Sequence, residues 1–152
     1  MQKILFSCMV IWTMNTVYAQ SNAVIYEALD CKKEWNYAVV KANLDKLAKP
    51  KNDSGALVYS LNTPFQYGKA ELNTFILNPT NLTGQFSNYI GYKKAFALIS
   101  PTNTLKKSKR ENSETHAYWN GWSQNNKDYI VRVEDSEIDS KTNIICGWFD
   151  FS

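Results

Sequence analysis

The sequence is poor in the residues on which most metal and catalytic centres depend. Histidine occurs once, as His116, and the 152 residues include six glycines and three cysteines. A single histidine excludes a multi-histidine zinc site and the metalloprotease motif with two histidines on one helix. The chain also has no Gly-x-Ser-x-Gly nucleophile elbow and no phosphate-binding glycine loop. We therefore expect no metal site and no bound cofactor.

A long apolar run is also missing. The N-terminal run Ile4–Trp12 is shorter than the roughly 20 residues that a membrane-spanning helix needs. It follows Lys3 and leads to Val17-Tyr18-Ala19, whose first and third side chains are small enough for a signal peptidase. This arrangement predicts a cleavable signal peptide over residues 1–19, followed by one domain over residues 20–152. We expect a periplasmic or secreted protein with no stable membrane anchor.

The charge of the chain is too small to indicate a nucleic-acid-binding protein. The sequence has 17 basic and 14 acidic residues, which gives a formal net charge of +3. The predicted signal peptide contains one basic residue and no acidic one, so 16 basic and 14 acidic residues remain, a net charge of +2. Such a balance attracts a polyanion only weakly. We expect a protein partner and no nucleic acid.

The scarce cysteines predict a structural bond. Removal of the signal peptide removes Cys8 and leaves Cys31 and Cys146. In an oxidising compartment, two cysteines allow one intramolecular pairing. The bond would close a loop of about 115 residues, for which chain entropy predicts a stabilisation of roughly 4–5 kcal/mol. We predict a disulfide between Cys31 and Cys146.

Residues 31–48 are predicted to form a helix at the start of the domain. Asp30 is a suitable N-cap, and Pro50 would stop the helix. Apolar side chains recur at spacings of three and four residues, which predicts one buried stripe. The stripe consists of Tyr37, Val40, Leu44 and Leu47, and it is widened by Trp35 and Val39. A short strand over residues 35–40 is the alternative.

After the turn-rich stretch 49–55, the pattern is typical of β-strands. Six runs are apolar or alternate in polarity, and most end at turn-forming residues. They are Ala56–Leu61, Ala70–Leu77, Lys94–Ser100, His116–Trp122, Asp128–Glu134 and Asn143–Phe151. The last three are expected to form an antiparallel meander. The predicted fold class is α+β, with one N-terminal amphipathic helix packed on a mainly antiparallel sheet of about six strands.

A candidate binding segment begins at Pro101. Residues 101–115 are polar throughout, and loops this long in a compact domain are usually functional or disordered. The loop contains a cluster of cations and is followed by large aromatic residues, which are enriched in binding hot spots. The predicted binding residues are Lys106, Lys107, Lys109, Arg110, Tyr118, Trp119 and Trp122. The alternatives are a solvated loop followed by aromatic residues that belong to the core.

Carboxylates at Asp135, Glu137 and Asp139 have the spacing that begins a calcium-binding loop. Such a loop also needs glycine at its sixth position and glutamate at its twelfth, where this chain has Ser140 and Cys146. We therefore expect an acidic turn without calcium.

One catalytic arrangement remains as an alternative. Cys31 follows Asp30 at the predicted helix start, where a helix dipole would lower the pKa of a thiol, and His116 begins a later strand. This layout resembles the papain-like cell-wall amidases, on the residues Asp30-Cys31 and His116-Ala117-Tyr118. The resemblance implies that Cys31 is the nucleophile and His116 its base. The chain departs from that family at Lys32-Lys33-Glu34, where small residues are expected, and it lacks a glycine close after the histidine.

The absence of a coherent catalytic set favours a binding protein. We predict an exported, non-enzymatic domain, a small bacterial envelope inhibitor or immunity protein that blocks a partner enzyme such as a cell-wall hydrolase. The first alternative is a secreted papain-like cysteine amidase or peptidase that uses Cys31 and His116. The second is a subunit of a surface assembly.

Overall fold

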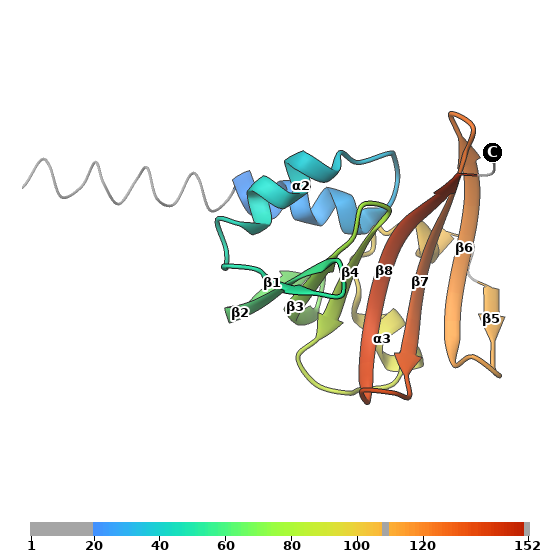
Figure 1. Cartoon of the computed structure of the whole chain (residues 1–152). Coiled ribbons are helices and arrows are strands. Elements are labelled where there is room, and N and C mark those ends of the chain that lie inside the picture. Colours follow the sequence, from blue (N-terminus) through green and yellow to red (C-terminus); the bar gives the residue numbers. More distant parts are fainter. Residues whose placement is uncertain (1–19, 108–109, 151–152) are drawn as a thin grey trace, which may run out of the picture.

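The computed structural model describes residues 20–107 and 110–150, so the predicted signal peptide and Lys109 lie outside the described residues. Within those ranges the chain is α+β, with three α-helices and one antiparallel sheet of eight strands (Figure 1). The strand order is β1-β2-β3-β4-β8-β7-β6-β5. The predicted fold class is confirmed in outline, but the predicted counts of one helix and about six strands are wrong.

The sheet consists of two meanders that meet at their last strands. The first contains β1 (Lys51–Asp53), β2 (Ala56–Tyr67), β3 (Ala70–Leu77) and β4 (Asn81–Phe86). The second contains β5 (Arg110–Asn112), β6 (Ala117–Gln124), β7 (Lys127–Ser136) and β8 (Lys141–Asp150). Strands β4 and β8 join the meanders, from the pair Asn81–Gly147 to the pair Gln85–Asn143. The predicted C-terminal meander is confirmed, whereas β1, β4 and β5 were not predicted.

Two helices occupy the region where one was predicted. Residues 20–30 are helical, and α2 spans Tyr37–Leu44. Cys31 has a φ of 56°, in the left-handed region that commonly ends a helix. Asn36 then caps α2, because its side chain accepts a hydrogen bond of 3.1 Å from the Val39 N–H. The predicted helix start at Cys31 is wrong, and Asp30 is the last helical residue of residues 20–30.

The buried stripe of α2 was largely predicted. Val40 and Leu44 are buried, Trp35 is 8% exposed, and Leu47 packs against the core. Val39 is 50% exposed, so the prediction that it widens the buried stripe is wrong.

The predicted strand Lys94–Ser100 is wrong, because most of this segment forms α3 (Tyr92–Leu98). Tyr92 and Ala95 of this helix and Ile99 at its C-cap are buried, and their spacing of three and four is the helical period. The short 3₁₀ helix η1 (Thr104–Lys107) and strand β5 then occupy much of the predicted loop 101–115. Leu105 is fully buried in η1.

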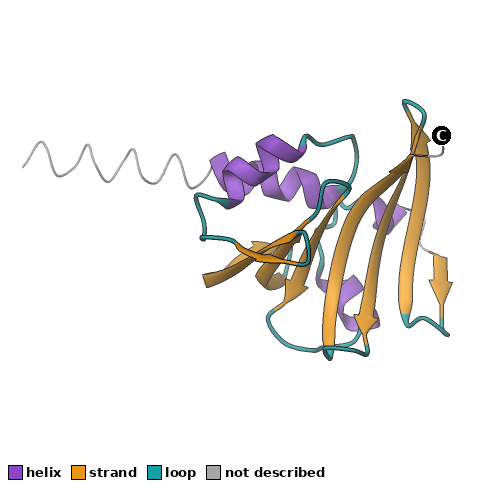
Figure 2. Cartoon of the chain, in the orientation of Figure 1, coloured by secondary structure: helices purple, strands orange, loops and turns teal. Residues whose placement is uncertain are grey.

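The helices lie on one face of the sheet (Figure 2). The disulfide Cys31–Cys146 joins the end of the first helix to β8, as predicted, and both cysteines are fully buried. Trp35 donates its indole N–H to the Cys146 sulfur at 3.4 Å, and its ring meets that of Trp148 edge to face at 5.1 Å. Helix α3 contacts β6, β7 and β8. The core therefore lies between this helix layer and one face of the sheet.

Candidate functional site

The opposite face of the sheet, called here the helix-free face, carries the best candidate site. Successive side chains of a strand point to opposite faces. Since Cys146 points towards the helices, its neighbour Ile145 belongs to the helix-free face. The strand register extends the row of Ile145 through Arg132 on β7 and Trp119 on β6 to Arg110 on β5.

The helix-free face contains polar residues even where it is little exposed. Thr83, Gln85 and Asn143 are between 6% and 9% exposed on the central strands β4 and β8. The carboxyl group of Glu134 lies beside them on β7, and burial raises its pKa while Arg132 lowers it. Arg132 Nε lies 3.0 Å from Glu134 Oε2. The polar side chains of this face contrast with the apolar core on the other side.

The predicted binding residues divide between the two faces. Tyr118 is 7% exposed on the helix side, where its ring packs 4.9 Å from Phe96. Trp122 shares this side and stacks on Tyr129 at 5.4 Å. Their contacts are those of core residues. Trp119 points to the helix-free face and remains partly exposed.

Trp119 lies between two arginines. The Arg110 guanidinium is 5.0 Å from the centre of its indole ring, and Arg110 pairs with it across β5 and β6. On the other side, Arg132 pairs with Trp119 across β6 and β7. Cation–aromatic contacts of this kind hold an arginine in place without neutralising its charge. The three residues, Arg110, Trp119 and Arg132, are called here the arginine–tryptophan row.

The lysines of the predicted cluster do not all join this row. Lys106 donates a hydrogen bond of 3.3 Å to the Ala97 carbonyl and lies 4.9 Å from the Phe96 ring, on the helix side. Burial lowers the pKa of Lys106. Lys107 is exposed. Among the described residues, no carboxylate forms an ion pair with Lys106, Lys107 or Arg110.

The candidate nucleophile and base have other partners. The Cys31 sulfur is bonded to Cys146, and Cys31 follows the end of a helix, where the dipole disfavours a thiolate. His116 directly precedes β6, and its Nδ1 is 3.8 Å from Glu137 Oε1. The two features that suggested a cysteine amidase, a free thiol and a helix N-terminus, are both missing at Cys31.

Asp135, the first carboxylate of the predicted acidic turn, lies near the end of β7 and has a structural role. Asp135 accepts hydrogen bonds from the Tyr92 N–H at 3.1 Å and from the Thr142 hydroxyl at 3.0 Å. It thereby supplies the cap that Gly91 lacks at the start of α3. Within residues 20–107 and 110–150, no group of three or more ligand side chains could hold a metal ion.

A buried polar cluster anchors the end of the first helix. Asp30 is 6% exposed and accepts hydrogen bonds from the Tyr67 hydroxyl at 2.7 Å and the Thr102 hydroxyl at 2.5 Å. Asn103 donates to the Tyr67 oxygen at 2.8 Å. Burial raises the pKa of Tyr67 far above its ordinary value, and the adjacent Asp30 carboxylate adds to the shift. Strongly shifted groups can mark functional sites, but these four residues hydrogen-bond to one another inside the domain.

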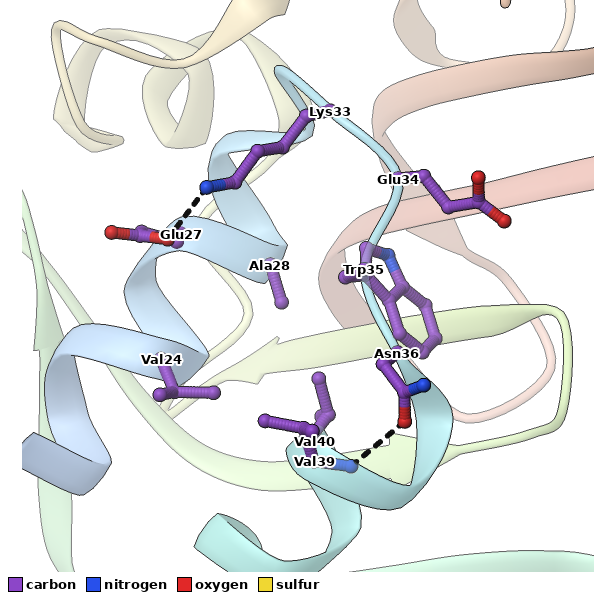
Figure 3. Close-up of a pocket in the computed structure, with 9 residues that line it drawn as sticks. All are labelled: Val24, Glu27, Ala28, Lys33, Glu34, Trp35, Asn36, Val39 and Val40. Carbon is purple, nitrogen blue, oxygen red and sulfur yellow. Dashed lines mark hydrogen bonds and ion pairs between the residues drawn. The ribbon is translucent and has the colours of Figure 1, made fainter. Parts of the chain in front are cut away.

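A hollow of about 190 Å³ lies between the first helix and α2 (Figure 3). Its lining comes from both helices and from the loop that joins them, and includes Val24, Ala28, Trp35 and Val40. The hollow was not expected from the sequence, because the first helix was not predicted. The spacing of the buried residues Ser21, Ile25, Ala28 and Leu29 is the signal that would have identified that helix.

Among the described residues, no helix is long and apolar enough to cross a membrane. Comparison with protein-family models, curated proteins and solved structures finds no match to this chain.

Proposed function

We propose that this chain is an exported, non-enzymatic binding domain that blocks a partner enzyme, such as a secreted hydrolase or toxin that acts on the bacterial cell wall. The observation that carries the proposal is the position of Trp119 on the helix-free face, partly exposed between Arg110 and Arg132. Tryptophan and arginine are the residues most enriched among binding hot spots.

The charges of this region favour an acidic partner surface. Guanidinium groups bind carboxylates in a planar, bidentate geometry. Arg132 is engaged by Glu134, whereas Arg110 and Lys107, which are three residues apart in the chain, form no ion pair with a described carboxylate. A partner that supplies acidic side chains would complete these interactions. The active-site cleft of a hydrolase that works with carboxylates is one such surface.

Export is supported by the disulfide. Cys31 and Cys146 are 115 residues apart in the sequence and bonded in the fold. Structural disulfides of this kind persist in oxidising compartments. A periplasmic or secreted location is therefore part of the proposal.

The alternatives have less support. The cysteine amidase needs the Cys31 thiolate, which the disulfide removes. A subunit of a surface assembly could polymerise through its sheet edges, but β1 and β5 are only three residues long, and short edge strands discourage pairing between molecules.

The proposal is tested by capture of the partner on immobilised protein. The bait is the disulfide-bonded chain without residues 1–19, incubated with the secreted and envelope proteins of the native cell. We expect a captured hydrolase whose cell-wall-degrading activity the protein inhibits. A triple variant, Lys107→Ser, Arg110→Ser and Trp119→Ser, should lose the partner.

The matched control carries Lys46→Ser, Lys49→Ser and Tyr89→Ser, which removes the same charge and one exposed aromatic ring outside the arginine–tryptophan row. Capture and inhibition should survive in this control. Equal capture by both triple variants, with both folded by circular dichroism, would show that the arginine–tryptophan row is not the binding surface. Cell-wall-degrading activity of the protein itself that is lost in Cys31→Ala would establish the enzyme instead.

A further inference from the structure

One buried side chain of the helix-free face lacks a hydrogen-bond donor. Asn143 is 6% exposed, and its Oδ1 atom is buried and accepts no hydrogen bond from a described residue. The strand register places Asn143 on β8 between Gln85 on β4 and Glu134 on β7. Buried polar atoms in folded proteins almost always have a partner, so one that does not calls for an explanation. The free protein therefore leaves an acceptor unmet on the face that is proposed to bind.

The donors around Asn143 are held by carboxylates. Gln85, directly opposite on β4, donates its side-chain N–H to Asp139 Oδ2 at 3.4 Å. Arg132, one pair further along β7 and β8, has its Nε 3.0 Å from Glu134 Oε2. Side chains at opposite positions of neighbouring strands are close enough to interact. Gln85 is thus within reach of Asn143, but its amide is held by Asp139.

Asp139 is the charged group of this cluster that an incoming ligand can reach. It lies exposed in the turn between β7 and β8. Among the described residues no cation forms an ion pair with Asp139, whereas Glu134 is matched by Arg132. The hydrogen bond from Gln85 is longer than most N–H···O bonds in proteins, and such bonds are weak. A cation from outside can therefore bind Asp139 without displacing a cation of the protein.

We propose that a basic side chain of the partner protein binds Asp139 and thereby frees the Gln85 amide to donate to Asn143 Oδ1. A hydrogen bond between two charged groups is stronger than one from a neutral amide, so the cation replaces Gln85 at Asp139. The exchange also supplies the buried acceptor with the donor that it lacks. This inference rests on the proposed protein-binding function. It adds that the partner carries a cation beside the carboxylates that face Arg110, on the same face of the sheet as Trp119.

The inference is tested with analogues of single residues. N-acetyl-argininamide is titrated into the disulfide-bonded, ¹⁵N-labelled protein at low ionic strength, and N-acetyl-citrullinamide serves as the uncharged comparison of nearly the same shape. We expect saturable shifts of the side-chain amide signals of Gln85 and Asn143, with a Kd on the order of 10 mM for the arginine analogue. The citrulline analogue should give none. Absence of saturable shifts with the arginine analogue would overturn the inference, as would equal shifts with both compounds.

Two matched variants locate the cation. Asp139→Asn keeps the shape of the side chain and removes its charge, so it should weaken binding of the arginine analogue roughly tenfold. Asp53→Asn changes an exposed aspartate on β1 that also forms no ion pair with a described residue, and it should bind like wild type. Unchanged binding in Asp139→Asn would overturn the inference.

A third variant tests the exchange at Gln85. Asn143→Leu removes the unmet acceptor, so it should raise the urea midpoint and weaken binding of the arginine analogue roughly fivefold. A purely structural role of Asn143 would change the midpoint and leave the binding unchanged. Binding that is lost in Asp139→Asn but kept in Asn143→Leu would therefore overturn the exchange. If Asn143→Leu fails to fold, the amide shifts of Gln85 and Asn143 in wild type decide.

The two proposals fail separately. The triple variant Lys107→Ser, Arg110→Ser and Trp119→Ser should bind N-acetyl-argininamide at least as well as wild type, because it keeps Asp139 and loses positive charge. If the titration fails while wild type still captures the partner, only the contact at Asp139 is lost. If the titration succeeds while no partner is captured, the inhibitor function is lost and the site for a basic group stands.

Discussion

On the central strands β4 and β8, both faces of the sheet bury their residues, but with different chemistry. On the helix side, Phe75, Val131 and Ile144 are fully buried, and the helices supply matching apolar side chains. On the helix-free face, Gln85 of β4 and Asn143 of β8 are also below 10% exposed. A polar side chain in a buried position contributes less to stability than an apolar one. The helix side is therefore built for stability, and the helix-free face carries chemistry that stability does not require.

Tyr118 and Trp119 show this division at neighbouring positions. Tyr118 contacts Phe96 and Tyr92 in the core, and Trp119 contacts Arg110 outside it. If the helix side serves stability and the helix-free face serves binding, substitutions on the helix side should change the free energy of unfolding, and those on the helix-free face should change the affinity for the partner. The predictions below test that division.

The largest expected effect is the loss of the disulfide. Cys31→Ala with Cys146→Ala should lower the free energy of unfolding by about 4 kcal/mol, because the bond restricts a loop of 115 residues in the unfolded chain. Urea unfolding followed by tryptophan fluorescence measures the loss, since Trp35 lies against the Cys146 sulfur. A loss below about 1 kcal/mol would mean that the helix layer holds to the sheet without the bond.

The next effect compares two adjacent residues on opposite faces. Tyr118→Ala should cost about 3 kcal/mol, since it leaves a cavity against Phe96 and Tyr92. Trp119→Ala should cost about 1 kcal/mol or less, because Trp119 is partly exposed. Urea midpoints of the two variants give the comparison directly. Equal losses would contradict the assignment of Trp119 to binding, since its ring would then be as important to the fold as that of Tyr118.

The sequence predicted the second meander better than the helices. Strand β7 alternates between buried and less buried residues from Tyr129 to Glu134, so its pattern shows in the sequence alone. The helix boundary at Cys31 could not be predicted, because a left-handed residue in mid-pattern leaves the apolar spacing unchanged. Strand β5 was not predicted, because it is only three residues long and polar. The cap of α3 was not predicted either, because it comes from Asp135, 43 residues away in the chain.

The candidate site was predicted by residue type and not by arrangement. Arg110 and Trp119 were both expected to bind, and alternation along β6 places Trp119 on the opposite face from Tyr118 and Trp122. The contribution of Arg132 depends on the register between β6 and β7, which no local pattern encodes. The hollow between the helices depends on how two helices meet, and that is a tertiary property.

A smaller effect tests the polar anchor of the helix layer. Tyr67→Phe should cost about 2 kcal/mol at neutral pH, because Asp30 and Asn103 each lose a hydrogen-bond partner. The raised pKa of Tyr67 means that the folded state keeps a proton that the unfolded state releases above about pH 10. The stabilisation by Tyr67 is therefore complete below that pH and declines as the pH rises further.

Urea midpoints of wild type and Tyr67→Phe at pH 7, 9 and 10.5 measure this decline. Unfolding of wild type should become easier above pH 10, and the difference between the two proteins should narrow there. Tyr26→Phe is a suitable comparison, because its hydroxyl bonds only to the neighbouring Ser100 among the contacts described. A gap between wild type and Tyr67→Phe that widens with pH would contradict the assignment of the raised pKa to Tyr67.

The smallest effect is expected on the helix-free face, where the substitution should raise the free energy of unfolding instead of lowering it. Glu134→Gln should raise the free energy of unfolding by about 0.5 kcal/mol at pH 7, because burial disfavours the charged carboxylate. A carboxyl group whose pKa is raised in the folded state makes the protein more stable as the pH falls. The stability advantage of Glu134→Gln over wild type should therefore vanish below about pH 4, where Glu134 is protonated in both the folded and the unfolded state. The same variant frees Arg132 from its ion pair, and its affinity for an acidic partner should rise. A variant that gains stability but leaves affinity unchanged would place the partner's carboxylates at Arg110 and not at Arg132.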